Sequence, residues 1–116
     1  MFTEALVSRN AGGHVKLDEV LILDDFLGLR EIMVVQHTDC GATHFDIPKF
    51  HQTLKRRVSE DLDLENNNFG FISDLKESVR KEVHLMRQSP LMRQEIKDHI
   101  FGFIFDIKTG LLEQVA

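Results

Sequence analysis

The chain has 116 residues, of which 42% are hydrophobic and 28% are charged, and its formal net charge is −5 at pH 7. This composition excludes an intrinsically disordered chain and fits a single soluble globular domain over residues 1–116. An acidic chain also lacks the basic surface that attracts nucleic acid or an anionic membrane, so we expect neither as a partner.

The first half of the chain predicts a strand, a helix and a second strand. An apolar run at residues 5–8 predicts a short strand, and the paired glycines of residues 9–13 predict a tight loop after it. Apolar side chains at helical spacing predict a helix over residues 17–27, and Gly28 follows where a C-cap glycine belongs. The continuous, β-branched run at residues 32–35 predicts a strand that is buried on both faces.

Two further helices are predicted in the middle of the chain. The first spans residues 50–58 and leads into a polar loop over residues 61–68. The second begins after Ser73, which is a suitable N-cap, and carries apolar side chains at helical spacing along one face. Ser89 and Pro90 end it, because proline cannot continue a helix.

The C-terminal part of the chain predicts two strands. Residues 100–107 alternate phenylalanine with isoleucine and glycine, so we expect a strand that is apolar and buried on both faces. Residues 108–110 predict a turn, and residues 111–115 predict a last short strand. This order of strands and helices predicts an α/β fold with a mainly parallel sheet flanked by helices.

The sharpest local motif is the pair His37 and Cys40, which follows directly on a predicted buried strand, where α/β sheets place their chemistry. Imidazole and thiolate both bind zinc. Zinc requires four ligands, however, so this spacing alone favours a buried thiol beside a hydrogen-bonded histidine over a metal site. His14 and His44 are candidates for an additional ligand. Asp39 could orient His37, although its position favours a cap of the helix that follows.

Two other interpretations of these residues stay open. Cys40 and a histidine could form a nucleophilic pair, but no neighbouring residue marks the thiol as activated, so metal binding ranks higher. The loop of residues 9–13 could present backbone N–H groups to an anion, although a tight loop between strand and helix is the simpler interpretation.

The sequence also bears on where the protein works. Cys40 is the only cysteine, which excludes an intrachain disulfide. Residues 1–10 lack the basic and apolar pattern of a secretory signal, and no apolar run approaches the length that spans a bilayer. We therefore expect a cytoplasmic protein.

Several segments, taken together and in order, resemble the β-carbonic anhydrase family. Residues 9–13 are similar to its Arg-Asn-Ala-Gly-Gly loop, and residues 31–41 are similar to its strand with the His-x-x-Cys-Gly zinc motif. Further similar segments are residues 71–75, 78–80, 89–91 and 102–110. The resemblance covers essentially the whole chain, so it is specific where His-x-x-Cys alone is not.

The resemblance implies the reversible hydration of carbon dioxide, or of a related small carbonyl compound, by a zinc-bound hydroxide. Zinc is then the expected cofactor, and carbon dioxide and bicarbonate are the expected small-molecule partners. It also implies that His37 and Cys40 are zinc ligands. The substrate pocket would be lined by Asn10, Ala11, Gly12 and Gly41.

The chain also departs from the family pattern. The family carries an upstream Cys-x-Asp-x-Arg motif on the first strand of its sheet, whose Cys is the third zinc ligand and whose Asp and Arg control the open metal position. That motif has no counterpart in this sequence. We therefore expect a β-carbonic anhydrase-like sheet without its first strand, zinc bound in part or not at all, and weak or altered activity. The alternative is a non-catalytic family member that serves as a binding or assembly module.

The same departure predicts assembly. Without an interior strand, the predicted strands at residues 5–8 and 32–36 would be left with unpaired backbone groups, which are costly to bury. Either these two strands pair directly or another chain covers the open edge. We expect a homodimer or a higher oligomer.

Overall fold

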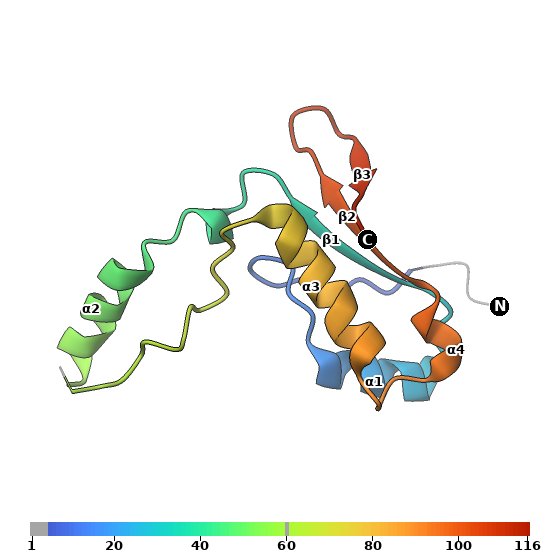
Figure 1. Ribbon diagram of the computed structural model, residues 1–116, viewed down its shortest axis with the longest axis horizontal. Helices are drawn as coiled ribbons and strands as arrows, with labels where there is room; N and C mark the ends of the chain where they lie inside the picture. Colours follow the sequence, from blue (N-terminus) through green and yellow to red (C-terminus); the bar gives the residue numbers. More distant parts are fainter. Residues whose placement is uncertain (1–4, 60) are drawn as a thin grey trace.

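The computed structural model describes residues 5–59 and 61–116, and it confirms the expected α/β class. In chain order, the elements are α1 (Leu17–Leu27), β1 (Ile32–His37), the 3₁₀ turn η1 (Gly41–Thr43), α2 (Ile47–Arg57), α3 (Leu75–Gln88), α4 (Gln94–Lys97), β2 (Ile100–Phe105) and β3 (Leu112–Gln114). Helix α3 lies across the sheet, and α1 and α4 lie below it (Figure 1). Within the described ranges, no helix has both the length and the apolar character needed to cross a membrane.

The three strands form one mixed sheet in the order β1-β2-β3. Strands β1 and β2 are parallel, with Val34 opposite Gly102, and β2 and β3 are antiparallel, with Ile104 opposite Glu113. The strand predicted at residues 5–8 is wrong, because these residues are exposed and form no regular element. They do not pair with β1, whose outer edge has no partner strand among the described residues.

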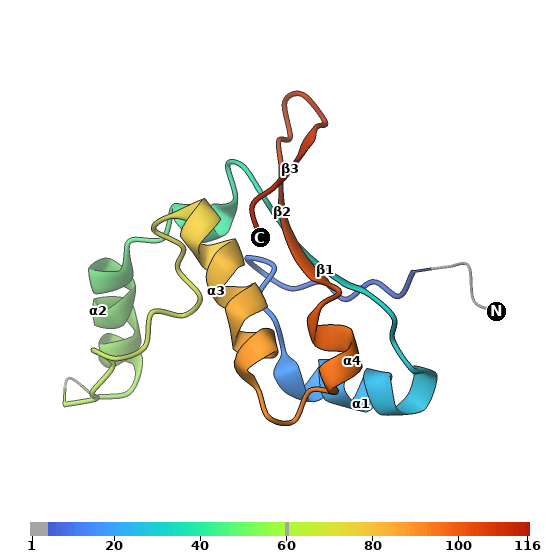
Figure 2. The ribbon, with the colours of Figure 1, turned by 45° about the vertical axis from the view of Figure 1, so that its right-hand side comes forward.

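Only one face of the sheet is covered. Val34 and Ile100 belong to a buried core with Val83 of α3, and α1 packs against the same core. On the opposite face Met33 is 54% exposed and Val35 is 42% exposed. The prediction that both long strands are buried on both faces is therefore wrong, because α3 covers one side and the other side stays open (Figure 2).

The capping residues explain where α1, α2 and α3 begin or end. Helix α1 has the predicted bounds, and Gly28 ends it with a φ of +64° and an N–H donated to the Asp24 carbonyl at 2.8 Å. Helix α2 begins earlier than predicted because the Asp46 side chain accepts the Lys49 N–H and caps it. The N-cap of α3 is Asp74, not Ser73, because the Asp74 carboxylate accepts the Glu77 N–H at 3.0 Å.

Helix α2 and the loop that follows it project away from the sheet (Figures 1 and 2). No residue of α2 is buried. The rings of Phe50 and Phe69 pack edge to face with centroids 5.0 Å apart, and His51 Nε2 lies 2.7 Å from the Asn67 carbonyl. The Cα radius of gyration is 16.6 Å, whereas a compact domain of this length has about 13 Å. The chain therefore carries an arm that packs mainly on itself.

An ion pair joins α1 to the segment before α4. Arg93 donates from Nε and Nη2 to the two carboxylate oxygens of Asp24, at 2.8 and 2.7 Å. Asp24 is only 7% exposed. Its hydrogen bonds with Arg93 lower the pKa of Asp24, although burial acts in the opposite direction.

We expect Asp24→Asn to lower the free energy of unfolding by about 1–3 kcal/mol near neutral pH, because a charged hydrogen-bonded pair is lost. Because the pKa of Asp24 is lower in the folded state than in the unfolded state, its stabilisation is present above the unfolded value of about 3.9 and is lost as pH falls through the folded value. Urea unfolding from about pH 7 to about pH 2 should show the two proteins converging in acid. The control is Asp25→Asn at the exposed neighbouring position, and a difference that stays constant with pH would contradict the prediction.

Candidate functional site

Strand β1 ends at His37, so the motif lies past the carboxyl end of a strand, as predicted. The turn after His37 is hydrogen-bonded to the end of β2, because the Thr38 N–H donates to the Phe105 carbonyl at 2.9 Å. The Thr38 hydroxyl also accepts the Ile107 N–H at 3.1 Å. Asp39 has a φ of +52°, a left-handed conformation that is uncommon outside glycine and reverses the chain between His37 and Cys40.

Cys40 is buried where η1 begins. Its relative exposure is 7%, and it packs with Ala42 and Ile72. The Cys40 carbonyl accepts the Thr43 N–H at 2.9 Å and the Thr43 hydroxyl at 2.6 Å. These two bonds fix the turn that carries the thiol.

His37 is exposed, and only one of its ring nitrogens has a hydrogen-bond partner among the described residues. Nδ1 lies 2.7 Å from the Thr38 carbonyl. Because a carbonyl only accepts, Nδ1 must carry the proton, which leaves Nε2 to present its lone pair in the neutral ring. A metal-ligating histidine has this arrangement, with the non-ligating nitrogen bonded to a carbonyl. The imidazole of His37 and the thiol of Cys40 therefore fit zinc in donor type.

The number of ligands is smaller than a zinc site requires. Across residues 5–59 and 61–116, no three His, Cys, Asp or Glu side chains are grouped so that they could hold a metal ion. A catalytic zinc takes three protein ligands and a water. The described residues thus provide two donors of the right kind and no third.

The two candidate additional ligands have other partners. His44 Nε2 lies 2.8 Å from the Asp39 carboxylate, and both side chains are exposed. The cap predicted for Asp39 is wrong, because η1 has no side-chain cap and the Asp39 side chain meets His44 instead. His14 has both ring nitrogens engaged, Nδ1 by Glu82 at 2.7 Å and Nε2 by the Gly70 carbonyl at 2.8 Å.

The loop of residues 9–13 lies beside the motif. The Asn10 side chain closes the loop, because it donates to the His14 carbonyl at 2.6 Å and accepts the His14 N–H at 2.8 Å. A Cβ placed on Gly13 would lie 2.9 Å from the Val35 carbonyl oxygen, and one on Gly12 would lie 3.3 Å from Ala42 Cβ. The backbone therefore passes close to both β1 and η1. The loop of residues 9–13 therefore lies next to η1, the turn that contains Gly41 and Ala42.

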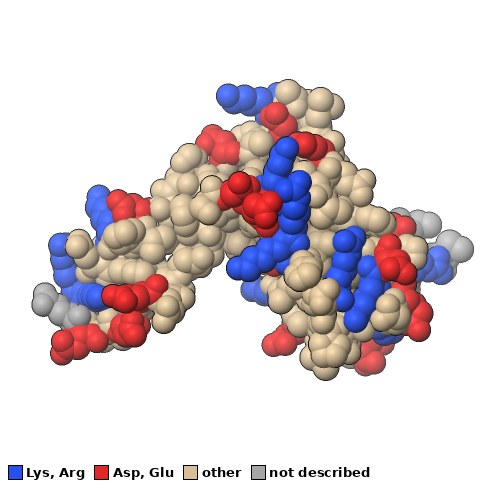
Figure 3. Space-filling view, in the orientation of Figure 1, with Lys and Arg blue, Asp and Glu red and all other residues tan. Residues whose placement is uncertain are grey.

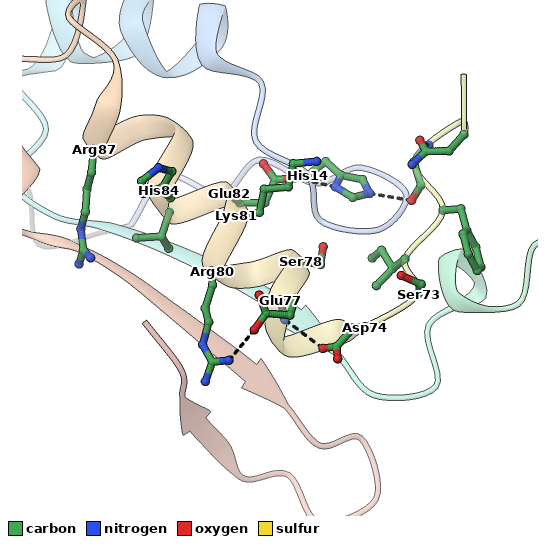
Figure 4. A pocket seen from close by; sticks show the side chains of 15 residues that line it. His14, Ser73, Asp74, Glu77, Ser78, Arg80, Lys81, Glu82, His84 and Arg87 are labelled. Atoms are coloured by element: carbon green, nitrogen blue, oxygen red, sulfur yellow. Dashed lines mark hydrogen bonds and ion pairs between the residues drawn. The ribbon is translucent and has the colours of Figure 1, made fainter. Parts of the chain in front are cut away.

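An open groove of about 820 Å³ runs along α3 (Figure 4). The residues that line it include His14, Gly70, Arg80, His84 and Arg87. Neither His37 nor Cys40 lines it. On the face seen in Figure 3, Lys and Arg side chains lie interspersed with Asp and Glu.

Sequence reasoning did not foresee the residues that hold His14. Glu82 and Gly70 lie 68 and 56 positions from it in the chain. No local pattern marks either of them, since Glu82 is one of several charged residues on the polar side of an amphipathic helix.

Comparison with known proteins gives consistent results. The chain is 32% identical to β-carbonic anhydrase 1 of Mycobacterium tuberculosis, over 97% of this chain and 68% of that protein. It is 28% identical to a carbon disulfide hydrolase of Acidithiobacillus thiooxidans, over 94% of this chain and 63% of that protein. It is also similar to the crystal structure of a carbonic anhydrase from Streptococcus mutans, with a TM-score of 0.76 and 39% identity over 93% of this chain and 64% of that chain. The chain thus spans 63–68% of the length of these three proteins, and no family profile matches it.

Proposed function

Because this chain belongs to the β-carbonic anhydrase family, we propose that it acts in the hydration of carbon dioxide, or of a related small compound such as carbon disulfide, at a zinc site that includes His37 and Cys40. One observation carries the proposal. Nδ1 of His37 is bound to the Thr38 carbonyl, whereas Nε2 has no partner in the part of the chain that the structure describes, and a buried thiol follows three residues later at the same sheet edge. These are the donor types and the tautomer that zinc requires.

The residues of this chain have distinct roles in the proposed site. Zinc, when bound, supplies a water that is acidic enough to give hydroxide near neutral pH. The hydrogen bond to the Thr38 carbonyl orients the His37 ring, and the two bonds from Thr43 hold the turn of Cys40. The loop of residues 9–13 covers this turn from one side and would line the pocket for a small, uncharged substrate. The third ligand comes from outside the described residues, and a partner chain is one source.

A second candidate function is a non-catalytic binding or assembly module. The absence of a third ligand among the described residues favours it, as does the open apolar face of the sheet. The zinc content of protein purified without chelator separates the two candidates. Stoichiometric zinc with turnover of carbon dioxide or carbon disulfide supports the enzyme, and metal-free, inactive protein supports the module.

We also propose that the chain forms a homodimer or a higher oligomer. The outer edge of β1 is unpaired among the described residues, and Met33 and Val35 leave an apolar surface beside it. An open strand edge next to exposed apolar side chains favours association.

We expect Val35→Glu to weaken this assembly by about tenfold or more, because a charge would be placed on the exposed apolar surface that the proposed contact would bury. Sedimentation velocity at micromolar concentration measures the effect. Ile107→Glu is the matched control, since Ile107 is 48% exposed and lies outside the strands. A wild-type protein that sediments as a well-folded monomer would contradict the assembly.

A further inference from the structure

The loop of residues 9–13 is held in place by an interaction that the zinc motif does not use. His14 follows this loop, and its ring lies between α3 and the segment before it (Figure 4). Nδ1 lies 2.7 Å from Glu82 Oε1, and Nε2 lies 2.8 Å from the Gly70 carbonyl oxygen. The two contacts join His14 to residues that lie 56 and 68 positions further along the chain.

The partners of His14 link the end of the loop to α3. A carbonyl oxygen only accepts, so Nε2 donates to Gly70. One oxygen of Glu82 lies 2.7 Å from Nδ1, and the second oxygen accepts the Val15 N–H at 3.0 Å. Glu82 therefore contacts two consecutive residues, the His14 ring and the Val15 backbone.

The surroundings of this ion pair are partly shielded from water. The side chains of His14 and Glu82 are 28% and 13% exposed. Glu77, Lys81 and His84 line the same groove. Among the described residues, none of these three makes an ion pair or hydrogen bond with His14. Glu82 is therefore its single charged partner there.

The ring is also enclosed by close backbone approaches on two sides. A Cβ placed on Gly12 would lie 2.8 Å from His14 Nε2, and one placed on Gly70 would lie 3.3 Å from it. The segment after Gly70 is hydrogen-bonded to η1, the turn that follows Cys40, because the Ile72 N–H donates to the Ala42 carbonyl at 2.9 Å. A continuous set of contacts thus leads from Glu82 through His14 to the turn that carries Cys40.

We propose that His14 and Glu82 are positioning residues, whose contact sets the loop of residues 9–13 against the turn that carries Cys40. The consequence for catalysis rests on the proposed function, whereas the positioning itself does not. His14 is then a structural residue beside the site and not a zinc ligand.

The placement of the loop tests the proposal. In Glu82→Gln, hydrogen exchange at the amides of His14 and Val15 should accelerate by about tenfold to hundredfold, because a charged hydrogen-bond partner is lost. Alkylation of Cys40, the only thiol of the chain, should also become faster. Exchange in β2 should stay the same, which shows that the domain remains folded.

Glu77→Gln is the matched control, because it makes the same carboxylate-to-amide change on the same helix and in the same groove. It should change neither the exchange of the His14 amide nor the alkylation of Cys40. Equal effects of the two variants, or an unchanged loop in Glu82→Gln, would refute the positioning role. None of these measurements needs zinc or turnover, so an inactive protein would refute the proposed function and leave this test intact.

Discussion

Replacing Cys40 with serine, or His37 with alanine, is expected to remove zinc from the protein and to abolish any turnover of carbon dioxide. Loss of an outer hydrogen bond to a metal ligand typically weakens metal affinity by about 10–100-fold, and loss of a ligand should exceed that. The effect should be large here because no group of three or more His, Cys, Asp or Glu side chains in residues 5–59 and 61–116 could hold the metal instead. Elemental analysis and a stopped-flow hydration assay measure the two losses.

His99→Ala is the control for these variants, since His99 is exposed and lies before β2, away from the motif. It should retain the zinc content and the activity of the wild-type protein. Full zinc occupancy in either ligand variant would refute the assignment of His37 and Cys40. We expect wild-type turnover to be slower than that of the longer relatives, and turnover equal to theirs would mean that other residues complete the site.

Introducing a side chain at Gly102 is expected to cause the largest loss of stability. Gly102 lies in β2 under α3, and a Cβ there would be 2.5 Å from Val79 Cγ1 and 3.0 Å from Val83 Cγ2. Both valines are almost fully buried, so they have no room to move aside. Overpacking a core typically costs about 1–3 kcal/mol, and Gly102→Val should reach or exceed the upper end. That is a large part of the about 5–15 kcal/mol that stabilises an ordinary domain.

Gly41→Ala is the matched control, because no atom lies within 4 Å of a Cβ built at Gly41. Its unfolding midpoint in urea should stay close to that of the wild-type protein. Val79→Ala should partly rescue Gly102→Ala, since it removes the methyl group that the new Cβ would meet. Additive effects of the two changes would show that the clash is not with Val79.

The helices and strands that could be predicted from the sequence are those whose signals lie in neighbouring residues. Apolar spacing and the glycine at position 28 predicted α1 with its observed bounds, because helix periodicity and a left-handed C-cap are local properties. The position of His37 and Cys40 past the end of a strand was predicted for the same reason. The order of predicted strands and helices indicated the α/β class, which the structure confirms.

The covered faces of the sheet and the contacts between distant side chains could not be predicted from the sequence, because they depend on how the elements pack. The continuous apolar run of β1 predicted burial on both faces, but the open face depends on what packs there, and α3 reaches only one side. Residues 5–8 have a strand-like composition, but among the described residues no strand pairs with them and they form no strand. The sequence marked His14 only as a candidate additional zinc ligand, and it gave no sign that the fold brings Glu82, 68 residues away, to its ring. Contacts across such separations depend on how the elements pack, which no local pattern encodes.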